Sequence, residues 1–307
     1  MASHTTIILK NKPKVDYIFY LYSELWETWK SLPPYAMMNS AKVTFSKIKK
    51  MNVSNKTRIH RSADSGRYDL IDALRGITII SMVLFHFSYD VFIVFGRDPG
   101  WYFRTGPHIW QQTICWSFIL ISGFVWSWGK KKNLRRGVII NLCGFLVTAV
   151  TLLFMPSETI WFGVLNFIGC AILLMIPLDP PAEKIPPYTG ILISFILFLF
   201  FRNVQTGTVG FGSLLQIRLP EALYDVKILT PLGFPWPEFR SSDFFPMLPW
   251  FFLYLCGWFG NRIFLRHPSW QKTARTHIPF LTAIGRKSIW IYLLHQPVCY
   301  LIAMLLF

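Results

Sequence analysis

The sequence predicts an all-α protein, a polytopic bundle of transmembrane helices. Three observations lead to this fold class. Of the 307 residues, 53% are hydrophobic and only 15% are charged, whereas soluble domains carry about 25% charged residues. The apolar residues are gathered in long segments, and many Lys and Arg residues stand at the ends of those segments. Basic residues in this position are typical of connections on the inner side of a membrane.

Seven apolar segments approach or exceed the roughly 20 residues that a membrane-spanning helix needs. They are 71–95, 109–128, 137–154, 160–178, 188–201, 245–264 and 284–307. The fifth is the shortest, because Pro187 precedes it and Arg202 follows it. A cytoplasmic N-terminus places most of the 31 Lys and Arg residues inside, with clusters in the connections 129–136 and 261–287. We therefore expect an N-in, C-out protein of about seven spans in the plasma (inner) membrane.

The chain divides into a basic N-terminal extension, 1–66, and a transmembrane domain, 67–307. In the extension, the stretch 17–32 alternates Trp, Tyr and Leu with Glu and Lys. It suits a helix lying in the membrane interface, and a poorly ordered leader fits equally well. On the outer side, the connection 203–244 is long enough to be functional or disordered. Its aromatic residues favour packing over the mouth of the bundle, as a lid.

Several function classes are disfavoured by composition and motifs. The net charge is +16, but the basic residues flank apolar spans and accompany no nucleic-acid-binding motif. All five cysteines lie in apolar segments without metal-ligand spacing, so we expect neither a zinc site nor a disulfide framework. The glycine-rich stretch 207–212 follows no strand of a βαβ unit and fails as a nucleotide fingerprint.

The first span carries ionisable residues where hydrocarbon is expected. Arg75 and His86 are eleven residues apart, which on an α-helix is a rotation of roughly 20° and a rise of about 16 Å. They therefore share one face at different depths, and Asp90 lies one turn beyond His86 on nearly the same face. Ionisable side chains inside a span are costly and indicate function.

Several stretches carry a resemblance to a known family. The sequence DALRGI, at 72–77, is followed by His86 in the same span. Four further stretches occur in order along the chain: 122–137, 160–174, 232–250 and 285–298. The chain, from about residue 67 to the end, resembles the heparan-α-glucosaminide N-acetyltransferase-like membrane family. Its opening is also similar to that of the broader integral-membrane acyltransferases, in which an Arg and a His share the first span.

The resemblance implies an integral-membrane, acyl-CoA-dependent acetyltransferase. It implies acetyl-CoA as the donor, taken from the cytoplasm, and a glycan or amino sugar on the outer side as the acceptor. The other expected partner is the lipid bilayer, with no nucleic acid and no metal. A homo-oligomer is left open, as is the choice between direct transfer and an acetyl-histidine intermediate.

Three histidines are candidates for the chemistry, since acyl transfer needs a base with a pKa near neutrality. His86 is the first candidate, as general base or transient acetyl carrier, with Asp90 as the residue that orients its ring. His295 in the last span is expected to form a second polar wall. His108 competes for the catalytic role, because the lysosomal relative places its working histidine in this same connection. Each also has a structural reading, as a buried hydrogen-bonded histidine or, for His108, as part of an interfacial aromatic belt.

The remaining candidates are binding residues. Arg75, at the cytoplasmic end of the first span, can bind the phosphates of CoA or simply extend to the headgroups of the inner leaflet. Arg135 and Arg136 can contact the same phosphates, although membrane anchoring alone explains them. Asn166 offers an amide for an oxyanion or thioester carbonyl, or for an interhelical hydrogen bond. Asp243 on the outer connection can bind a sugar, although a solvated loop carboxylate is the commoner case.

Two rival functions stay open at this point. A transporter or channel would use the His86 and Asp90 pair to relay protons or ions. An assembly or scaffold protein would use His86 only for packing. Labelled acetyl-CoA separates the enzyme from the transporter, and replacement of His86 separates the enzyme from the scaffold.

Overall fold

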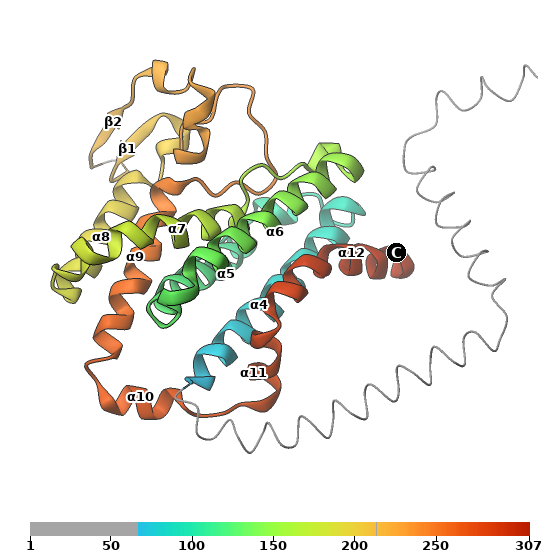
Figure 1. Cartoon of the computed structure of the whole chain (residues 1–307). Coiled ribbons are helices and arrows are strands. Elements are labelled where there is room, and N and C mark those ends of the chain that lie inside the picture. The colour runs from blue at the N-terminus through green and yellow to red at the C-terminus, as the bar shows by residue number, and fades with distance from the viewer. Residues whose placement is uncertain (1–66, 213) are drawn as a thin grey trace, which may run out of the picture. The chain divides into compact units, whose positions relative to one another are not determined.

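Helices make up most of the computed structural model, which describes residues 67–212 and 214–307 (Figure 1). The predicted interfacial helix at 17–32 lies outside these residues. The α-helices are α4 (Asp69–Tyr89), α5 (Thr105–Phe124), α6 (Asn133–Phe154), α7 (Val164–Glu183), α8 (Pro187–Phe201), α9 (Met247–Phe264), α10 (Pro268–Ala274), α11 (Pro279–Arg286) and α12 (Ser288–Leu306). Two short strands, β1 (Thr208–Gly210) and β2 (Gln216–Arg218), pair antiparallel.

Shorter helical turns extend or connect these elements. A π-helix, η1 (Asp90–Val94), continues α4 directly. The 3₁₀ turns are η2 (Trp101–Phe103), η3 (Trp126–Lys132), η4 (Pro156–Glu158), η5 (Val204–Thr206), η6 (Glu221–Leu223) and η7 (Lys227–Leu232).

Five helical stretches within the described residues are long and apolar enough to cross a membrane. They are Asp69–Val94, Trp126–Phe154, Val164–Glu183, Pro187–Thr206 and Ser288–Leu306. The protein is therefore a helical membrane protein, as the sequence predicts. The short fifth segment qualifies because η5 prolongs α8 beyond Arg202. The spanning role of α5 and α9 stays a prediction.

The last predicted span differs from the structure at its beginning. The segment 284–307 is not one helix, because α11 ends at Arg286 and α12 begins at Ser288. Lys287, between them, has φ −102° and ψ 9°, which is outside the helical region. This break allows α11 to pack on α4 while α12 leaves in another direction (Figure 1).

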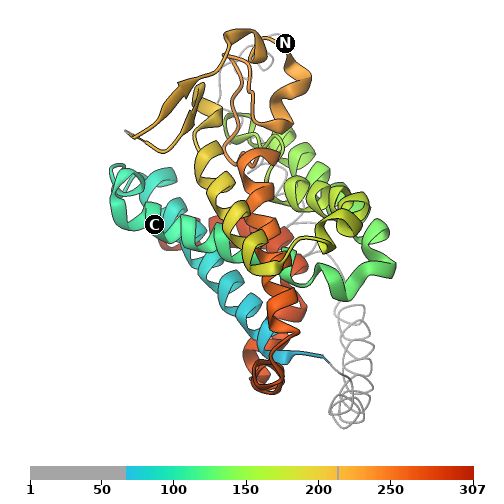
Figure 2. The ribbon, with the colours of Figure 1, turned by 90° about the vertical axis from the view of Figure 1, so that its left-hand side faces the viewer.

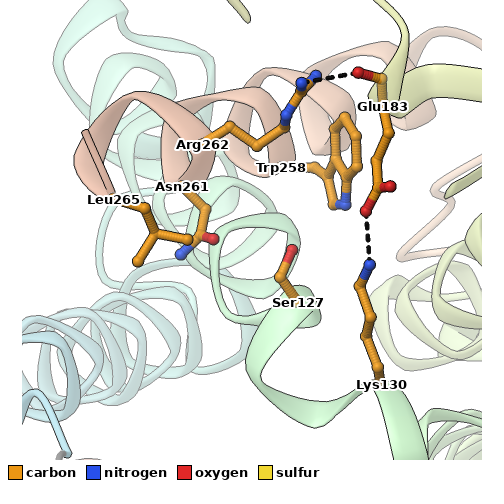
Figure 3. Close-up of a pocket in the computed structure, with 7 residues that line it drawn as sticks. All are labelled: Ser127, Lys130, Glu183, Trp258, Asn261, Arg262 and Leu265. Atoms are coloured by element: carbon orange, nitrogen blue, oxygen red, sulfur yellow. Dashed lines mark hydrogen bonds and ion pairs between the residues drawn. The ribbon is translucent and has the colours of Figure 1, made fainter. Parts of the chain in front are cut away.

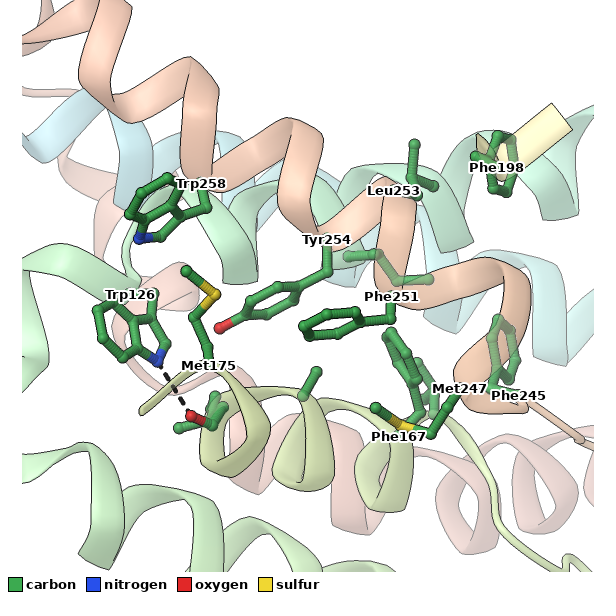
Figure 4. Close-up of a cluster of buried hydrophobic side chains, with 14 of the residues drawn as sticks. Trp126, Phe167, Met175, Phe198, Phe245, Met247, Phe251, Leu253, Tyr254 and Trp258 are labelled. Atoms are coloured by element: carbon green, nitrogen blue, oxygen red, sulfur yellow. Dashed lines mark hydrogen bonds between the residues drawn. The ribbon is translucent and has the colours of Figure 1, made fainter. Parts of the chain in front are cut away.

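The main core surrounds α9, which packs against α5, α7 and α8. Most of its side chains are buried, including Tyr254 and Trp258, and they meet Phe167 and Met175 from α7 (Figure 4). The Trp126 indole donates a hydrogen bond to the carbonyl oxygen of Ile172 at 3.1 Å. A helix that is apolar on all sides is typical of a buried position, and α9 occupies such a position among its neighbours.

Two pairs of glycines allow close helix contacts. A Cβ atom at Gly123 would collide with the backbone of α9, and one at Gly257 with the backbone of α5. Gly76 and Gly285 have the same reciprocal relation between α4 and α11. Small residues at helix crossings permit this approach in membrane bundles, where van der Waals packing is a main attraction between helices.

The long connection 203–244 is a compact cap at one end of the bundle, with α10 at the opposite end (Figures 1 and 2). The hairpin of β1 and β2 forms part of it, and the sequence did not indicate these strands. Gly207, Gly210 and Gly212 have positive φ angles of 82°, 133° and 59°. The glycines of the stretch 207–212 therefore serve the backbone of the hairpin, since other residues seldom adopt such angles.

Candidate active site

The first feature of the site is a pair of imidazoles. His86 projects from α4 and His295 from α12, and their ring centroids lie 4.7 Å apart. The two helices pack directly, and the Cys299 thiol lies 3.7 Å from the carbonyl oxygen of Val83. The structure therefore brings together two histidines that are more than 200 positions apart in the chain.

The hydrogen bonding of His295 defines its tautomer. Its Nδ1 lies 2.5 Å from the carbonyl oxygen of Tyr292. A carbonyl only accepts hydrogen bonds, so a neutral His295 carries its proton on Nδ1 and a lone pair on Nε2. Nε2 is buried and has no hydrogen-bond partner among the described residues. His295 thus presents a free basic nitrogen beside His86.

Asp90 is linked to α12, the helix that carries His295, by a hydrogen bond. Its Oδ1 accepts a hydrogen bond of 2.8 Å from the Gln296 amide, rather than from His86 one turn earlier. The π-helix η1 begins at Asp90, and the change from α- to π-geometry alters which way the following side chains point. Single π-turns are frequent at functional sites.

Unpaired polar atoms mark the same place. Within the described part of the chain, Asp90 Oδ2, Gln296 Oε1 and His295 Nε2 are all buried without a partner. Unpaired buried polar atoms are rare, because each costs free energy comparable to a lost hydrogen bond. Their concentration beside His86 indicates a polar site that a ligand or water completes.

An aromatic cluster packs around Phe85, whose ring centroid lies 6.0 Å from that of His86. Phe85 contacts Trp101 and Trp110, with ring centroids 5.6 and 5.4 Å apart. The Trp110 indole donates a hydrogen bond of 2.7 Å to the Ser81 hydroxyl. A wall of this kind limits water, and electrostatic interactions are stronger where water is excluded.

Asp243 reaches toward α12 from the cap. Its Oδ2 lies 3.4 Å from the backbone nitrogen of Val164, at the N-terminus of α7, and it is within electrostatic range of Tyr292. Burial raises the pKa of the Asp243 carboxyl to about 6. The residue is therefore half-buried and placed between the cap and the bundle, instead of being a solvated loop carboxylate.

At the other end of α4, Arg75 belongs to an ion-pair network. Its guanidinium lies 3.0 Å from Asp72, which also pairs with Arg67 at 2.8 Å and with Arg286 of α11 at 3.5 Å. Arg136, from the start of α6, is within electrostatic range of Arg75. Arg75 and Arg136 form a basic pair, and the helical spacing places Arg75 about 16 Å along α4 from His86.

The other predicted site residues lie elsewhere. His108 is exposed near the start of α5, and Arg135 is exposed on α6. Asn166 is buried between α6 and α7, where its amide lies 3.5 Å from the carbonyl oxygen of Asn141. These placements fit the structural readings of the three residues, while their functional roles stay predictions.

A sequence comparison identifies the family. Residues 67–297 match the family described as heparan-alpha-glucosaminide N-acetyltransferase, catalytic. The chain belongs to this family. The matched range contains Arg75, His86, Asp90 and both neighbours His295 and Gln296, and it confirms the resemblance seen in the sequence motifs. Comparisons with curated proteins and with solved structures find no match.

Membership in the heparan-alpha-glucosaminide N-acetyltransferase family indicates a membrane enzyme of the acetyltransferase type. Sequence reasoning did not select Gln296 or Tyr292 for this enzyme's site. The only local signal for Gln296 was its place beside His295, since an uncharged amide in a span is common. Asp243 was identified from the sequence, but its partial burial depends on the tertiary structure.

Proposed function

We propose that the protein transfers an acetyl group from cytoplasmic acetyl-CoA to an amino sugar or glycan on the outer side of the membrane. The observation that carries this proposal is the half-buried imidazole pair of His86 and His295, with the buried and unpaired Nε2 of His295. The family supports the acetyltransferase class. The basic pair at the far end of α4 supports a donor that carries phosphates, since guanidinium groups bind phosphates with two parallel hydrogen bonds.

The proposal includes an orientation. With the N-terminus in the cytoplasm and seven spans, α10 and α11 lie inside and the cap over 203–244 lies outside. The imidazole pair then lies toward the outer end of α4, and Arg75 lies at its inner end. An acetyl group delivered from inside would meet the acceptor at the histidines. We propose the plasma (inner) membrane as its location.

The donor's phosphates are assigned to Arg75 and Arg136. Arg75 is half-buried and held by Asp72, so its position is fixed before the donor binds. Arg136 is held by Asn133 at 3.1 Å. Two oriented guanidinium groups are a suitable receptor for a diphosphate. Arg135 and Asn166 are not assigned a part in this arrangement, and their functional roles stay predictions.

The chemistry follows from the tautomer of His295. The acceptor amine attacks the thioester carbonyl, forming the C–N bond as the C–S bond breaks. His295 Nε2 accepts the proton from the amine nitrogen and passes it to the departing thiolate, so the products are the acetamide and CoA thiol. Asp90 and Gln296 hold α12 against α4. In the alternative order, His86 first takes the acetyl group and then releases it to the amine.

Labelled donor tests the proposal. Purified full-length protein in vesicles is given acetyl-CoA labelled in the acetyl group, with glucosamine on the opposite side. Label on glucosamine supports the enzyme, and label trapped on the protein before acceptor is added supports the acetyl-histidine order. If neither is labelled while the protein stays folded, the proposed transfer is wrong.

One observation favours a second candidate, a proton- or ion-conducting transporter. The unpaired atoms of Asp90, Gln296 and His295 form a buried polar cluster in which water could bind. Such clusters carry protons in pumps and transporters. Proton flux into vesicles under a pH gradient, without any acetyl donor, would favour this function over the enzyme.

A further inference from the structure

The end of the bundle opposite the cap carries a surface that is both basic and aromatic. The segment 265–287 joins α9 to α12 and contains α10 and α11, and α10 lies across this end of the bundle (Figure 1). Residues 244–307 contain no Asp or Glu. Six exposed residues of the segment form what we call the basic surface: Arg266, Trp270, Lys272, Arg275, Phe280 and Lys287.

The cations of the basic surface are not neutralised by carboxylates. Within residues 67–212 and 214–307, no ion pair is formed by any of the four, Arg266, Lys272, Arg275 and Lys287. Two neighbouring cations are instead turned toward protein partners. Arg262, beside the buried Asn261, donates a hydrogen bond to the carbonyl oxygen of Glu183 (Figure 3), and Arg286 pairs with Asp69 at 2.7 Å. The four charges of the basic surface are therefore available to anions from outside this part of the chain.

Two large aromatic side chains project beside these cations. The exposed fractions are 52% for Trp270 and 70% for Phe280. Trp270 stacks on His267, with ring centroids 4.4 Å apart and an interplanar angle of 17°, so its ring is held in one orientation. Exposed aromatic side chains among Lys and Arg residues are typical of helices that lie in the membrane interface, where the rings reach the boundary between headgroups and acyl chains.

The basic surface is attached firmly to the transmembrane helices. On α10, the Gln271 amide oxygen accepts a hydrogen bond of 3.1 Å from the Tyr68 hydroxyl, and its amide nitrogen donates one to the carbonyl oxygen of Leu265. On α11, Gly285 approaches the backbone of α4 so closely that a Cβ atom would collide with it. The surface is thus formed before a ligand arrives, and preorganisation of this kind lowers the cost of binding.

We propose that the basic surface binds the headgroups of anionic phospholipids in the leaflet at this end of the bundle. This is the inner leaflet under the orientation in the proposed function, and the inference rests on that function in this respect. Clusters of about four to eight Lys and Arg residues next to transmembrane helices are typical of sites for anionic lipids. The lipid's negative charge lies among the four cations, while Trp270 and Phe280 contact the upper part of the acyl chains.

Charge complementarity favours lipid over two other occupants of the basic surface. A second copy of the chain would present the same four cations. The N-terminal extension, residues 1–66, contains more than twice as many Lys and Arg residues as Asp and Glu residues, so it is basic as well. Like charges repel at short range, whereas an anionic leaflet offers both negative charge for the cations and apolar surface for the aromatic side chains.

Lipid titration of the full-length protein in detergent tests the basic surface. The thermal unfolding midpoint is followed as phosphatidylglycerol or phosphatidylcholine with the same acyl chains is added, which gives an apparent dissociation constant for each. A basic residue close to an anionic lipid surface contributes about fivefold to affinity. Phosphatidylglycerol should therefore bind at least about 30-fold more tightly than phosphatidylcholine. The preference should shrink in about 1 M salt, where the Debye length is about 3 Å.

A double variant identifies the residues responsible. Lys272→Gln combined with Arg275→Gln should weaken the binding of phosphatidylglycerol about 25-fold and leave the binding of phosphatidylcholine unchanged. Arg218→Gln combined with Lys227→Gln is the matched control, because both residues are exposed in the cap at the other end, and it should keep the preference. Glycerol 3-phosphate supplies the phosphate without acyl chains, and it should leave the unfolding midpoint unchanged.

Several results would overturn the proposal. They are equal binding of the two lipids to the unchanged protein, an unaltered preference in the double variant, and stabilisation by glycerol 3-phosphate as large as that by phosphatidylglycerol, which would indicate a site for free phosphate. A lipid-independent dimer that the double variant abolishes would assign the surface to a second copy. Should the double variant fail to fold, photoactivatable phosphatidylglycerol is crosslinked to the unchanged protein. Label must then map to 265–287, and label confined to other segments refutes the site.

Activity measurements separate this inference from the proposed function. Acetyl transfer is assayed in vesicles that contain phosphatidylglycerol, alongside the binding titrations. A preference for phosphatidylglycerol without any acetyl transfer would keep the basic surface and reject the enzyme. Acetyl transfer by a protein that binds the two lipids equally would keep the enzyme and reject the basic surface.

Discussion

Replacement of His295 by glutamine tests the central assignment of the active site. The substitution removes the free basic Nε2 of His295 but keeps a polar side chain of similar size. Nε2 is buried beside His86, with the two ring centroids 4.7 Å apart. If it accepts the amine proton, we expect kcat to fall about 10²- to 10⁴-fold, the usual contribution of a general base. That loss corresponds to about 3–5 kcal/mol of transition-state stabilisation.

The assay is single-turnover transfer of labelled acetyl from acetyl-CoA to glucosamine, with thermal unfolding of each variant as a check on folding. The KM for acetyl-CoA should change little, because the donor's phosphates bind at the other end of α4. His108→Gln is the matched control, since this histidine is exposed on α5, and its activity should stay within about twofold of the original.

A double variant, in which both His86 and His295 are replaced by glutamine, adds a second test of the catalytic assignment. Catalytic residues that act as a unit are far from additive, so the double variant should lose about as much activity as the worse single variant. The reasoning fails if folded His295→Gln keeps more than a tenth of the activity. It fails equally if His108→Gln is the variant that loses activity.

Three further predictions concern other parts of the structure. Burial raises the pKa of Asp243 to about 6, whereas the pKa in the unfolded chain is near 4. The free energy of unfolding is therefore highest below pH 4 and falls as the pH rises through 6, by about 3 kcal/mol at most. Asp243→Asn should flatten this decline in unfolding experiments from pH 4 to 7, and an unchanged slope would show that another group causes it. Gly285→Ala should destabilise the protein by about 1–3 kcal/mol in thermal unfolding, because the new Cβ meets the backbone of α4. Gly106→Ala is the control and should have little effect, because Gly106 has open space around it. Equal effects of the two substitutions would refute the packing argument. Arg75→Gln should raise the KM for acetyl-CoA about tenfold or more with kcat nearly unchanged. Arg135→Gln, at an exposed position, should leave the KM unchanged. A raised KM in Arg135→Gln and not in Arg75→Gln would move the phosphate site to Arg135.

The sequence predicted the helical membrane class and the positions of most spans because hydropathy and basic flanks are local properties. The short segment 188–201 shows the limit of that approach, since η5 extends the helix through residues that are less apolar. The break between α11 and α12 was missed because the predicted span 284–307 was begun at Ile284, inside α11, although Gly285, Arg286 and Lys287 interrupt the apolar residues there.

Part of the candidate site could likewise be predicted from the sequence, and part could not. Helical spacing alone put Arg75, His86 and Asp90 on one face of α4. The approach of His295 and the pairing of Asp90 with Gln296 depend on how α12 packs against α4. No spacing within the sequence records that contact.

The sequence by itself determined which stretches enter the membrane and which ionisable residues they take with them, because transfer from water depends on each segment's own composition. Only the tertiary structure decided which of those residues meet. Helix contacts depend on the complementary packing of distant surfaces, such as glycines that admit a neighbouring backbone, and burial depends on everything around a group. The free nitrogen of His295, the raised pKa of Asp243 and the unsatisfied amide of Asn261 all arise at that level.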